Sequence, residues 1–183
     1  MIANNFNEEF FLQIREQEAW KELSGDSNFC WNEQLLERYK DKVDWEEISN
    51  NNAILWSSAM IEKFKSKIDW DECSRSNRYA RQTDNCYLYS IDNLRKFKTY
   101  WNWKALSSNS CVEWSYSMID EFADLINWAE LIDSCSIDQF PTQEFFEKYK
   151  SYFPASSLQN SRLWSNIMDK YKKELAIKIL SDS

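Results

Sequence analysis

The chain has 183 residues, a formal net charge of −8 at pH 7, ten tryptophans, one glycine and no histidine. The acidic balance argues against bulk binding to nucleic acid or to anionic membranes. Without histidine, the chain lacks the usual base of nucleophilic catalysis and a common metal ligand. A single glycine fits short connections between helices better than hairpins or a glycine-rich phosphate loop.

A repeat of about 25 residues organises the sequence. The tryptophan column, which gives the period most clearly, consists of Trp20, Trp45, Trp70, Trp103 and Trp128. A second column of aromatic residues precedes it by 14 positions and consists of Phe6, Trp31, Trp56, Tyr89 and Trp114. A fixed period in this range is typical of helical repeat architectures. Because the tryptophans recur in apolar columns, we expect all ten to pack in the core.

Each repeat is predicted to hold a long helix followed by a short one. Residues with short polar side chains precede the first helix and suit its N-cap: Asn7, Asn32, Ser57, Ser90, Ser115 and Ser165. The second helix opens at the tryptophan, after a capping residue that is Asp44, Asp69, Asn102 or Asn127. Within the second repeat, Leu35, Leu36, Tyr39 and Val43 fall on one helical face.

We therefore predict an all-α solenoid of about six to seven two-helix units, forming a single domain over residues 1–183. The repeats are clear over residues 6–135 and diverge over residues 136–183, where Pro154 and Ala155 replace the Asp-Trp pair.

The cysteines point to a reducing compartment. Their number is odd, and they form no C-x-x-C pair: Cys30, Cys73, Cys86, Cys111 and Cys135. The start of the chain lacks the features of a signal peptide, so we expect a cytoplasmic protein with free thiols.

We expect no metal and no cofactor. No apolar run approaches membrane-spanning length, and no membrane partner is expected.

The spacing from Trp70 to Trp103 is 33 residues, which implies an insertion of eight residues between Ser74 and Tyr89. Insertions in repeat proteins often lie on the binding face, and Arg and Tyr are enriched at binding hot spots. The insertion supplies Arg75, Arg78, Tyr79, Arg81 and Tyr87, and its basic flanks supply Lys63, Lys65, Lys67, Arg95, Lys96 and Lys98. We predict that these residues contact a partner; a tolerated surface loop and a solvated basic face are the alternatives.

The pattern Trp-Ser-x-x-Met-Ile-x-x-Phe at 56–64, followed by Ile-Asp-Trp-x-x-x-Ser at 68–74, resembles a known tandem repeat. That repeat is written W-S-x-x-L-I-x-x-F…W-D-W-x-x-L-S-x-N and is familiar from proteins of Bacteroidetes and giant viruses. The resemblance covers roughly residues 6–135. It implies a helical repeat scaffold and supplies no catalytic residues.

Three functional hypotheses remain open. The first is a non-catalytic protein-binding module that is monomeric outside its complex. A narrower form of it is an inhibitor that occludes a nucleic-acid-handling protein, as anti-CRISPR and other counter-defence proteins of phages and mobile elements do. The second is an RNA-binding protein that uses the basic segment 63–98. The third, an enzyme, is the least expected, because pairs such as Glu46–Glu47 are explained by the helix dipole.

Overall fold

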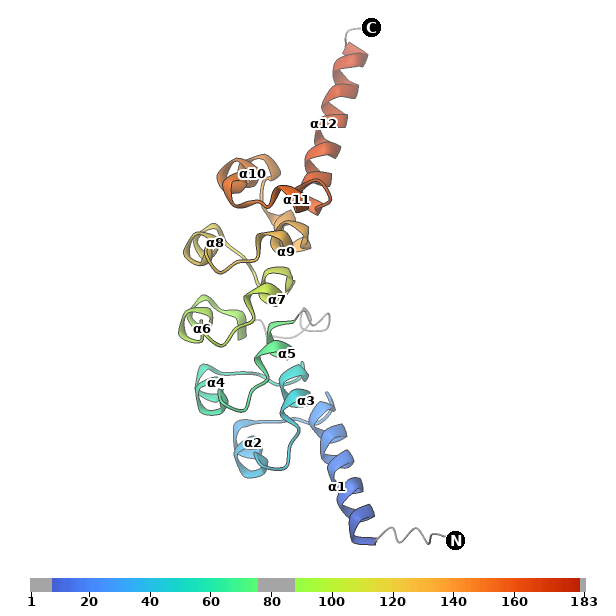
Figure 1. Ribbon diagram of the computed structural model, residues 1–183, viewed down its shortest axis with the longest axis vertical. Coiled ribbons are helices and arrows are strands. Elements are labelled where there is room, and N and C mark those ends of the chain that lie inside the picture. Colours follow the sequence, from blue (N-terminus) through green and yellow to red (C-terminus); the bar gives the residue numbers. More distant parts are fainter. Residues whose placement is uncertain (1–7, 76–87, 182–183) are drawn as a thin grey trace, which may run out of the picture. The chain divides into compact units, whose positions relative to one another are not determined.

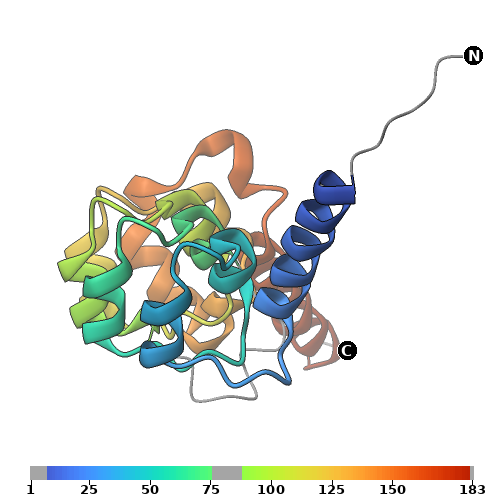
Figure 2. The same ribbon diagram turned by 90° about the horizontal axis from the view of Figure 1, so that it is seen from below.

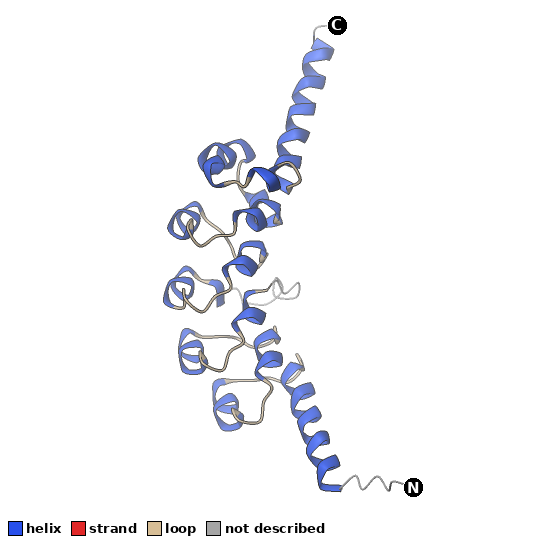
Figure 3. Ribbon diagram, in the orientation of Figure 1, coloured by secondary structure: helices blue, strands red, loops and turns tan. Residues whose placement is uncertain are grey.

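The computed structural model describes residues 8–75 and 88–181, which contain helices and no strand (Figure 3). The predicted all-α class is confirmed. The chain forms two compact units: unit 1 comprises Met1–Cys73 and Asn77–Lys98, and unit 2 comprises Ser74–Ser76 and Thr99–Ser183. The single domain stays a prediction.

Figure 1 labels the helices of both units. Those of unit 1 are α1 (Glu8–Gly25), α2 (Glu33–Tyr39), α3 (Trp45–Asn50), α4 (Ser58–Phe64), α5 (Trp70–Ser74), whose last residue is assigned to unit 2, and α6 (Ile91–Lys96). Those of unit 2 are α7 (Trp103–Ser108), α8 (Tyr116–Phe122), α9 (Trp128–Asp133), η3 (Cys135–Gln139), α10 (Thr142–Tyr149), η4 (Lys150–Tyr152), α11 (Ala155–Leu158) and α12 (Arg162–Ser181).

A buried serine near the end of α1, α3, α5 and α7 joins each of these helices to the start of the following tryptophan-led helix. In α3, the Ser49 hydroxyl donates to the Trp45 carbonyl at 2.6 Å and accepts the Asp69 backbone N–H at 2.9 Å. The equivalent hydroxyl of Ser107 donates to Trp103 at 2.6 Å and accepts the Asn127 N–H at 2.9 Å. The same acceptor contact joins the pairs Ser24–Asp44 and Ser74–Asn102, both at 3.0 Å. We call these serines the relay serines.

A buried asparagine two positions after a relay serine provides a second link. The side-chain amide of Asn51 donates to the carbonyls of Ser24 and Asp26 at 2.8 and 3.2 Å. Asn109 donates in the same way to the carbonyls of Ser74 and Arg75 at 3.1 and 3.0 Å. These bonds satisfy carbonyl groups at the end of the preceding helix, where the helix offers no donor of its own.

The predicted caps explain where most of these short helices begin. Asn32, Ser57, Ser90 and Ser115 each accept the N–H three residues on, as do the caps of the second helices, Asp44, Asp69, Asn102 and Asn127. Asn7 lies outside the described residues, and Ser165 was wrong as a cap. It lies inside α12, whose first turn is capped by the Ser161 hydroxyl.

Aromatic pairs stack one repeat on the next. Each member of the tryptophan column contacts the aromatic ring of the following first helix, with centroids 4.9–5.5 Å apart and planes inclined by 37–41°. The pairs are Trp20–Tyr39, Trp45–Phe64, Trp70–Phe97, Trp103–Phe122 and Trp128–Tyr149. The last pair shows that this ring contact recurs past residue 135, although its two residues are 21 positions apart instead of the 19 that separate Trp20–Tyr39, Trp45–Phe64 and Trp103–Phe122.

The expectation that all ten tryptophans are buried was wrong for half of them. Trp31, Trp56, Trp101, Trp114 and Trp128 are buried, whereas Trp20, Trp45, Trp70, Trp103 and Trp164 are only partly buried. The indole N–H groups of Trp45 and Trp70 donate to the backbone carbonyls five residues earlier, at 2.9 and 2.8 Å. Four of the five partly buried indoles belong to the tryptophan column, whose remaining member, Trp128, is buried.

Two helices are longer than the repeat pattern predicts. The first repeat forms the single helix α1, because Ala19 stands before Trp20 and supplies no cap to interrupt it. The helix α12 likewise runs unbroken through the last unit. Conversely, the predicted long helix that includes Val43 ends at Tyr39, since Asp44 must be extended to cap α3.

We predict that Ser49→Ala destabilises the protein by about 1–3 kcal/mol, the cost of leaving a partly buried backbone donor without its acceptor. The control is Ser66→Ala, which alters an exposed serine and should change the free energy of unfolding by less than about 0.5 kcal/mol. Urea unfolding of both variants measures the difference. Equal stabilities would show that the relay hydroxyl contributes nothing.

Candidate protein-binding surface

The structure describes only part of the predicted partner-contacting segment. Arg78, Tyr79, Arg81 and Tyr87 lie outside the described residues. The flanking residues that it does describe are Lys63 on α4, Lys65 and Lys67 after α4, Arg75 after α5, Arg95 and Lys96 on α6, and Lys98 after α6. Apart from Arg75, all of these belong to unit 1.

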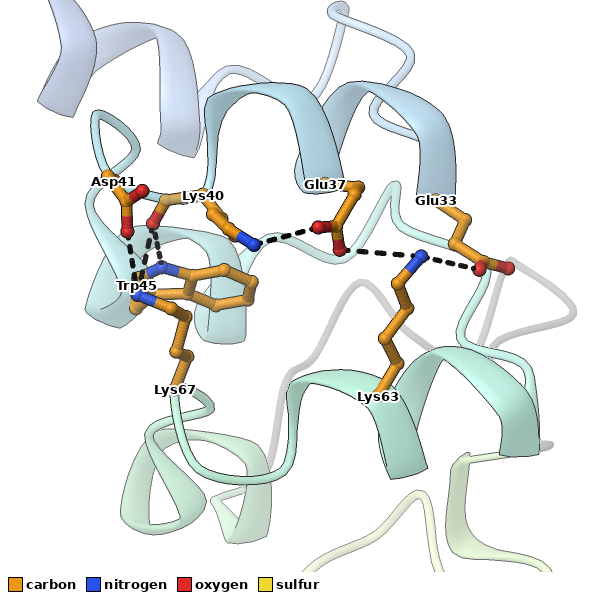
Figure 4. A network of polar contacts seen from close by, with 7 residues as sticks. All are labelled: Glu33, Glu37, Lys40, Asp41, Trp45, Lys63 and Lys67. Carbon is orange, nitrogen blue, oxygen red and sulfur yellow. Dashed lines mark hydrogen bonds and ion pairs between the residues drawn. The ribbon is translucent and has the colours of Figure 1, made fainter.

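The basic side chains of α4 and α6 pair with carboxylates of the preceding first helix. The Lys63 ammonium lies 3.1 Å from a Glu33 oxygen and 3.3 Å from a Glu37 oxygen, both on α2 (Figure 4). At the equivalent position on α6, Lys96 lies 3.0 Å from Glu62 on α4. The ion pairs therefore repeat from helix to helix.

The remaining lysines near α4 are also neutralised. Lys67 lies 3.2 Å from Asp41 and donates to the Lys40 carbonyl, which also accepts the Trp45 indole N–H (Figure 4). Lys65 pairs with Glu62. On α6, Arg95 lies 3.4 Å from Asp92.

The pairing lowers the pKa of the two bridging glutamates. A hydrogen bond from Lys40 is the main cause for Glu37, and a hydrogen bond from Lys65 is the main cause for Glu62. Each of these carboxylates forms ion pairs with two lysines, Glu37 with Lys40 and Lys63, and Glu62 with Lys65 and Lys96. The basic segment consequently projects much less positive potential than its composition suggests.

A different part of unit 1 concentrates negative charge. An open depression beside α1 and α3 is lined by Glu18, Lys21, Glu22, Gly25, Asp26 and Glu47. We call it the acidic depression. Its one lysine, Lys21, lies 3.6 Å from Glu47, so most of its carboxylates face solvent without a cation. Glu18, Glu22 and Asp26 are all exposed.

The only glycine of the sequence lies in the acidic depression. Gly25 does not have a positive φ, so its backbone does not demand glycine. A Cβ built at this position would lie 2.9 Å from the Glu47 carboxylate, close enough to displace that side chain. Gly25 therefore leaves room for Glu47 in the depression.

The cysteines of the described residues differ in burial. Burial raises the pKa of the Cys73 thiol to about 12, and Cys111 is also buried. Cys30 and Cys135 are exposed. No set of three or more His, Cys, Asp or Glu side chains within residues 8–75 and 88–181 is arranged to hold a metal ion. None of the helices in these two ranges is long and apolar enough to cross a membrane.

Comparison of the chain with models of known protein families, with curated proteins and with solved structures finds no match. The resemblance to the tandem tryptophan repeats thus stays a prediction.

Sequence reasoning found the basic residues and missed their partners. The ion pairs could have been predicted from glutamates that lie one repeat plus one residue before a lysine, as Glu37 lies 26 residues before Lys63. The acidic depression was harder to predict, because α1 is one continuous helix where two were expected.

The thiols provide a direct check of burial. In a Cys86→Ser variant, which removes the cysteine outside the described residues, we expect a thiol reagent such as DTNB to modify Cys30 and Cys135 in the native protein. Cys73 and Cys111 should react only after unfolding, because burial makes both thiols inaccessible and raises the pKa of the Cys73 thiol. Native-state modification of Cys73 as fast as that of Cys30 would contradict the structure.

Proposed function

We propose that this chain is a non-catalytic protein-binding module, built as a helical-repeat solenoid, whose acidic depression binds a positively charged surface of another protein. The observation that carries the proposal is the contrast between neutralised lysines and unneutralised carboxylates in unit 1. The described part of that unit has 17 acidic and 11 basic side chains, and eight of the basic ones are engaged in ion pairs.

The recurring contacts support the solenoid form of the proposal. The relay serines, the aromatic pairs and the ion pairs of the first helices all recur at the repeat spacing. Repeats that contact mainly their neighbours expose a row of equivalent side chains, and such rows suit an extended protein partner.

The charge of the depression favours a basic protein surface over RNA. Arginine and lysine side chains of a partner would find several carboxylates within one concave area, whereas phosphate groups would be repelled by them. A partner that itself handles nucleic acid has a suitable basic groove. A chain that fills such a groove would act as its inhibitor, by imitating the negative charge of the nucleic acid.

The test compares two variants that remove the same number of negative charges. E18Q/E22Q removes two from the acidic depression, and E113Q/D124N removes two exposed ones from unit 2. A partner is first captured from a nuclease-treated lysate of the source organism and is then titrated with each variant. We expect E18Q/E22Q to weaken binding at least about tenfold, from the loss of two complementary charges, and E113Q/D124N to leave it unchanged.

Salt dependence and nuclease treatment distinguish the alternatives. Equal affinities of the two variants would contradict the acidic depression as the binding surface. If a partner is captured from an untreated lysate but not from a nuclease-treated one, and if the chain binds RNA with an affinity that falls steeply with salt, the RNA-binding hypothesis is favoured instead.

A further inference from the structure

One ion pair recurs between successive first helices within the units. A carboxylate of one first helix lies 2.9–3.3 Å from a lysine of the next, in the pairs Glu37–Lys63, Glu62–Lys96 and Asp120–Lys148. The carboxylate is two residues before the aromatic residue that contacts the tryptophan column, and the lysine is one residue before it. Such a helix has a leading side, which faces the preceding first helix and carries the lysine, and a trailing side, which carries the carboxylate.

The leading side of α2 has no first helix before it. The first repeat is the continuous helix α1, which packs against α3 and lies to one side of α2 in both views (Figures 1 and 2). Arg38 occupies the lysine position on α2, is exposed, and has no carboxylate partner within residues 8–75 and 88–181. Its guanidinium lies 5.4 Å from the centre of the Tyr39 ring. The paired lysines lie 5.2–5.6 Å from the equivalent rings, in Lys63–Phe64, Lys96–Phe97 and Lys148–Tyr149.

The neighbouring side chain on the leading side of α2 is also less covered than its equivalents. Leu35, four residues before Tyr39, is only partly buried. The same position on α4, α6 and α10 is 6, 1 and 1% exposed and holds Met60, Asn93 and Phe145. Each of those three helices follows a first helix of its own unit. The missing first helix before α2 therefore accounts for the exposure of Leu35.

The trailing side of α10 shows the opposite gap. Phe146, three residues before Tyr149, is only partly buried, although α12 packs against α10. The same position on α2, α4 and α8 is 0% exposed and holds Leu36, Ile61 and Ile119. Each of those three helices is followed by a first helix of its own unit, whereas α10 is followed by η4, α11 and α12.

Glu147 occupies the carboxylate position on the trailing side of α10 and is exposed. Its contacts stay within its own helix and the residue that follows it: it pairs with Lys150 and accepts a hydrogen bond from the Gln143 side chain. Glu62 pairs with a lysine three residues on in the same way, and it still pairs with Lys96 of the next first helix. A pair of this kind thus leaves room for a cation from a following helix.

We propose that the trailing side of α10 in one molecule packs on the leading side of α2 in a second molecule, in the place of the missing first helix. Glu147 then pairs with Arg38 at the positions that Glu37 and Lys63 use, and Phe146 covers Leu35. Two copies of α2 would place arginine against arginine, and two copies of α10 would place glutamate against glutamate. The charges therefore select a heterologous contact, which can add a further molecule at each free end. This proposal replaces the expectation that the chain is monomeric on its own.

Charge reversal on each side tests the ion pair. R38E and E147R each place like charges across the contact and should lower the association constant at least about tenfold. Sedimentation velocity over a concentration series measures association, and wild type should exceed the 22.1 kDa of one chain as the concentration rises. The double variant R38E/E147R, and an equimolar mixture of the two single variants, should recover association, because each glutamate again faces an arginine.

Matched controls change residues outside the contact. K173E on α12 and E113R before α8, both at exposed positions, should associate as wild type does. F146S should lower the association constant roughly tenfold by removing apolar surface from the contact. Leu55→Ser, at a position 63% exposed in a loop of unit 1, should leave it unchanged. Circular dichroism checks that each variant remains folded.

A wild type that stays at the mass of one chain at every concentration would overturn the proposal. So would reversed variants that fail to recover association when combined, or charge controls that weaken it as much as R38E does. E18Q/E22Q should associate like wild type, and binding at the acidic depression does not require Arg38 or Glu147. Failure of one proposal is therefore distinguishable from failure of the other.

Discussion

The hydroxyl of the relay serine is the contact on which the repeat depends. It accepts the backbone N–H of the residue that caps the next tryptophan-led helix, as Ser49 does for Asp69. That amide belongs to the capping residue, whose own side chain is occupied with the first turn. Without the hydroxyl, the donor would be left in a partly buried position at a cost that a short helix can scarcely offset. Helices of five or six residues are thus stabilised by their neighbours.

The packing of successive first helices also determines which charged side chains of unit 1 form ion pairs. When first helices lie one repeat apart, a lysine of one helix reaches a glutamate of the helix before it, as Lys96 reaches Glu62. The lysines of α4 and α6 are engaged in these ion pairs. In the acidic depression beside α1 and α3, by contrast, carboxylates outnumber lysines. Exposed ion pairs stabilise little, so their main effect is on the charge that each surface presents to a partner.

Periodicity predicts the helical class and most of the caps, because Ser, Asn and Asp residues that recur at fixed positions before apolar segments are typical N-caps. It could not predict that Ala19 lets α1 continue, nor that Tyr39 ends α2, since both depend on competition between a cap and helix propagation. Of the predicted site, the basic residues were found from composition, but ion pairing depends on which helices are neighbours. The acidic depression depends on α1 ending at Gly25, beside Glu47 of α3, which no period indicates.

Hydrogen exchange at single amides tests the relay most directly. The backbone amides of Asp44, Asp69, Asn102 and Asn127 should be protected in the native protein, because each donates to a relay serine. Replacing Ser49 by alanine should accelerate exchange selectively at Asp69, while Asn127, whose acceptor is Ser107, keeps its protection. Unchanged exchange at Asp69, or equal acceleration at both amides, would contradict a local hydroxyl contact as the link between repeats.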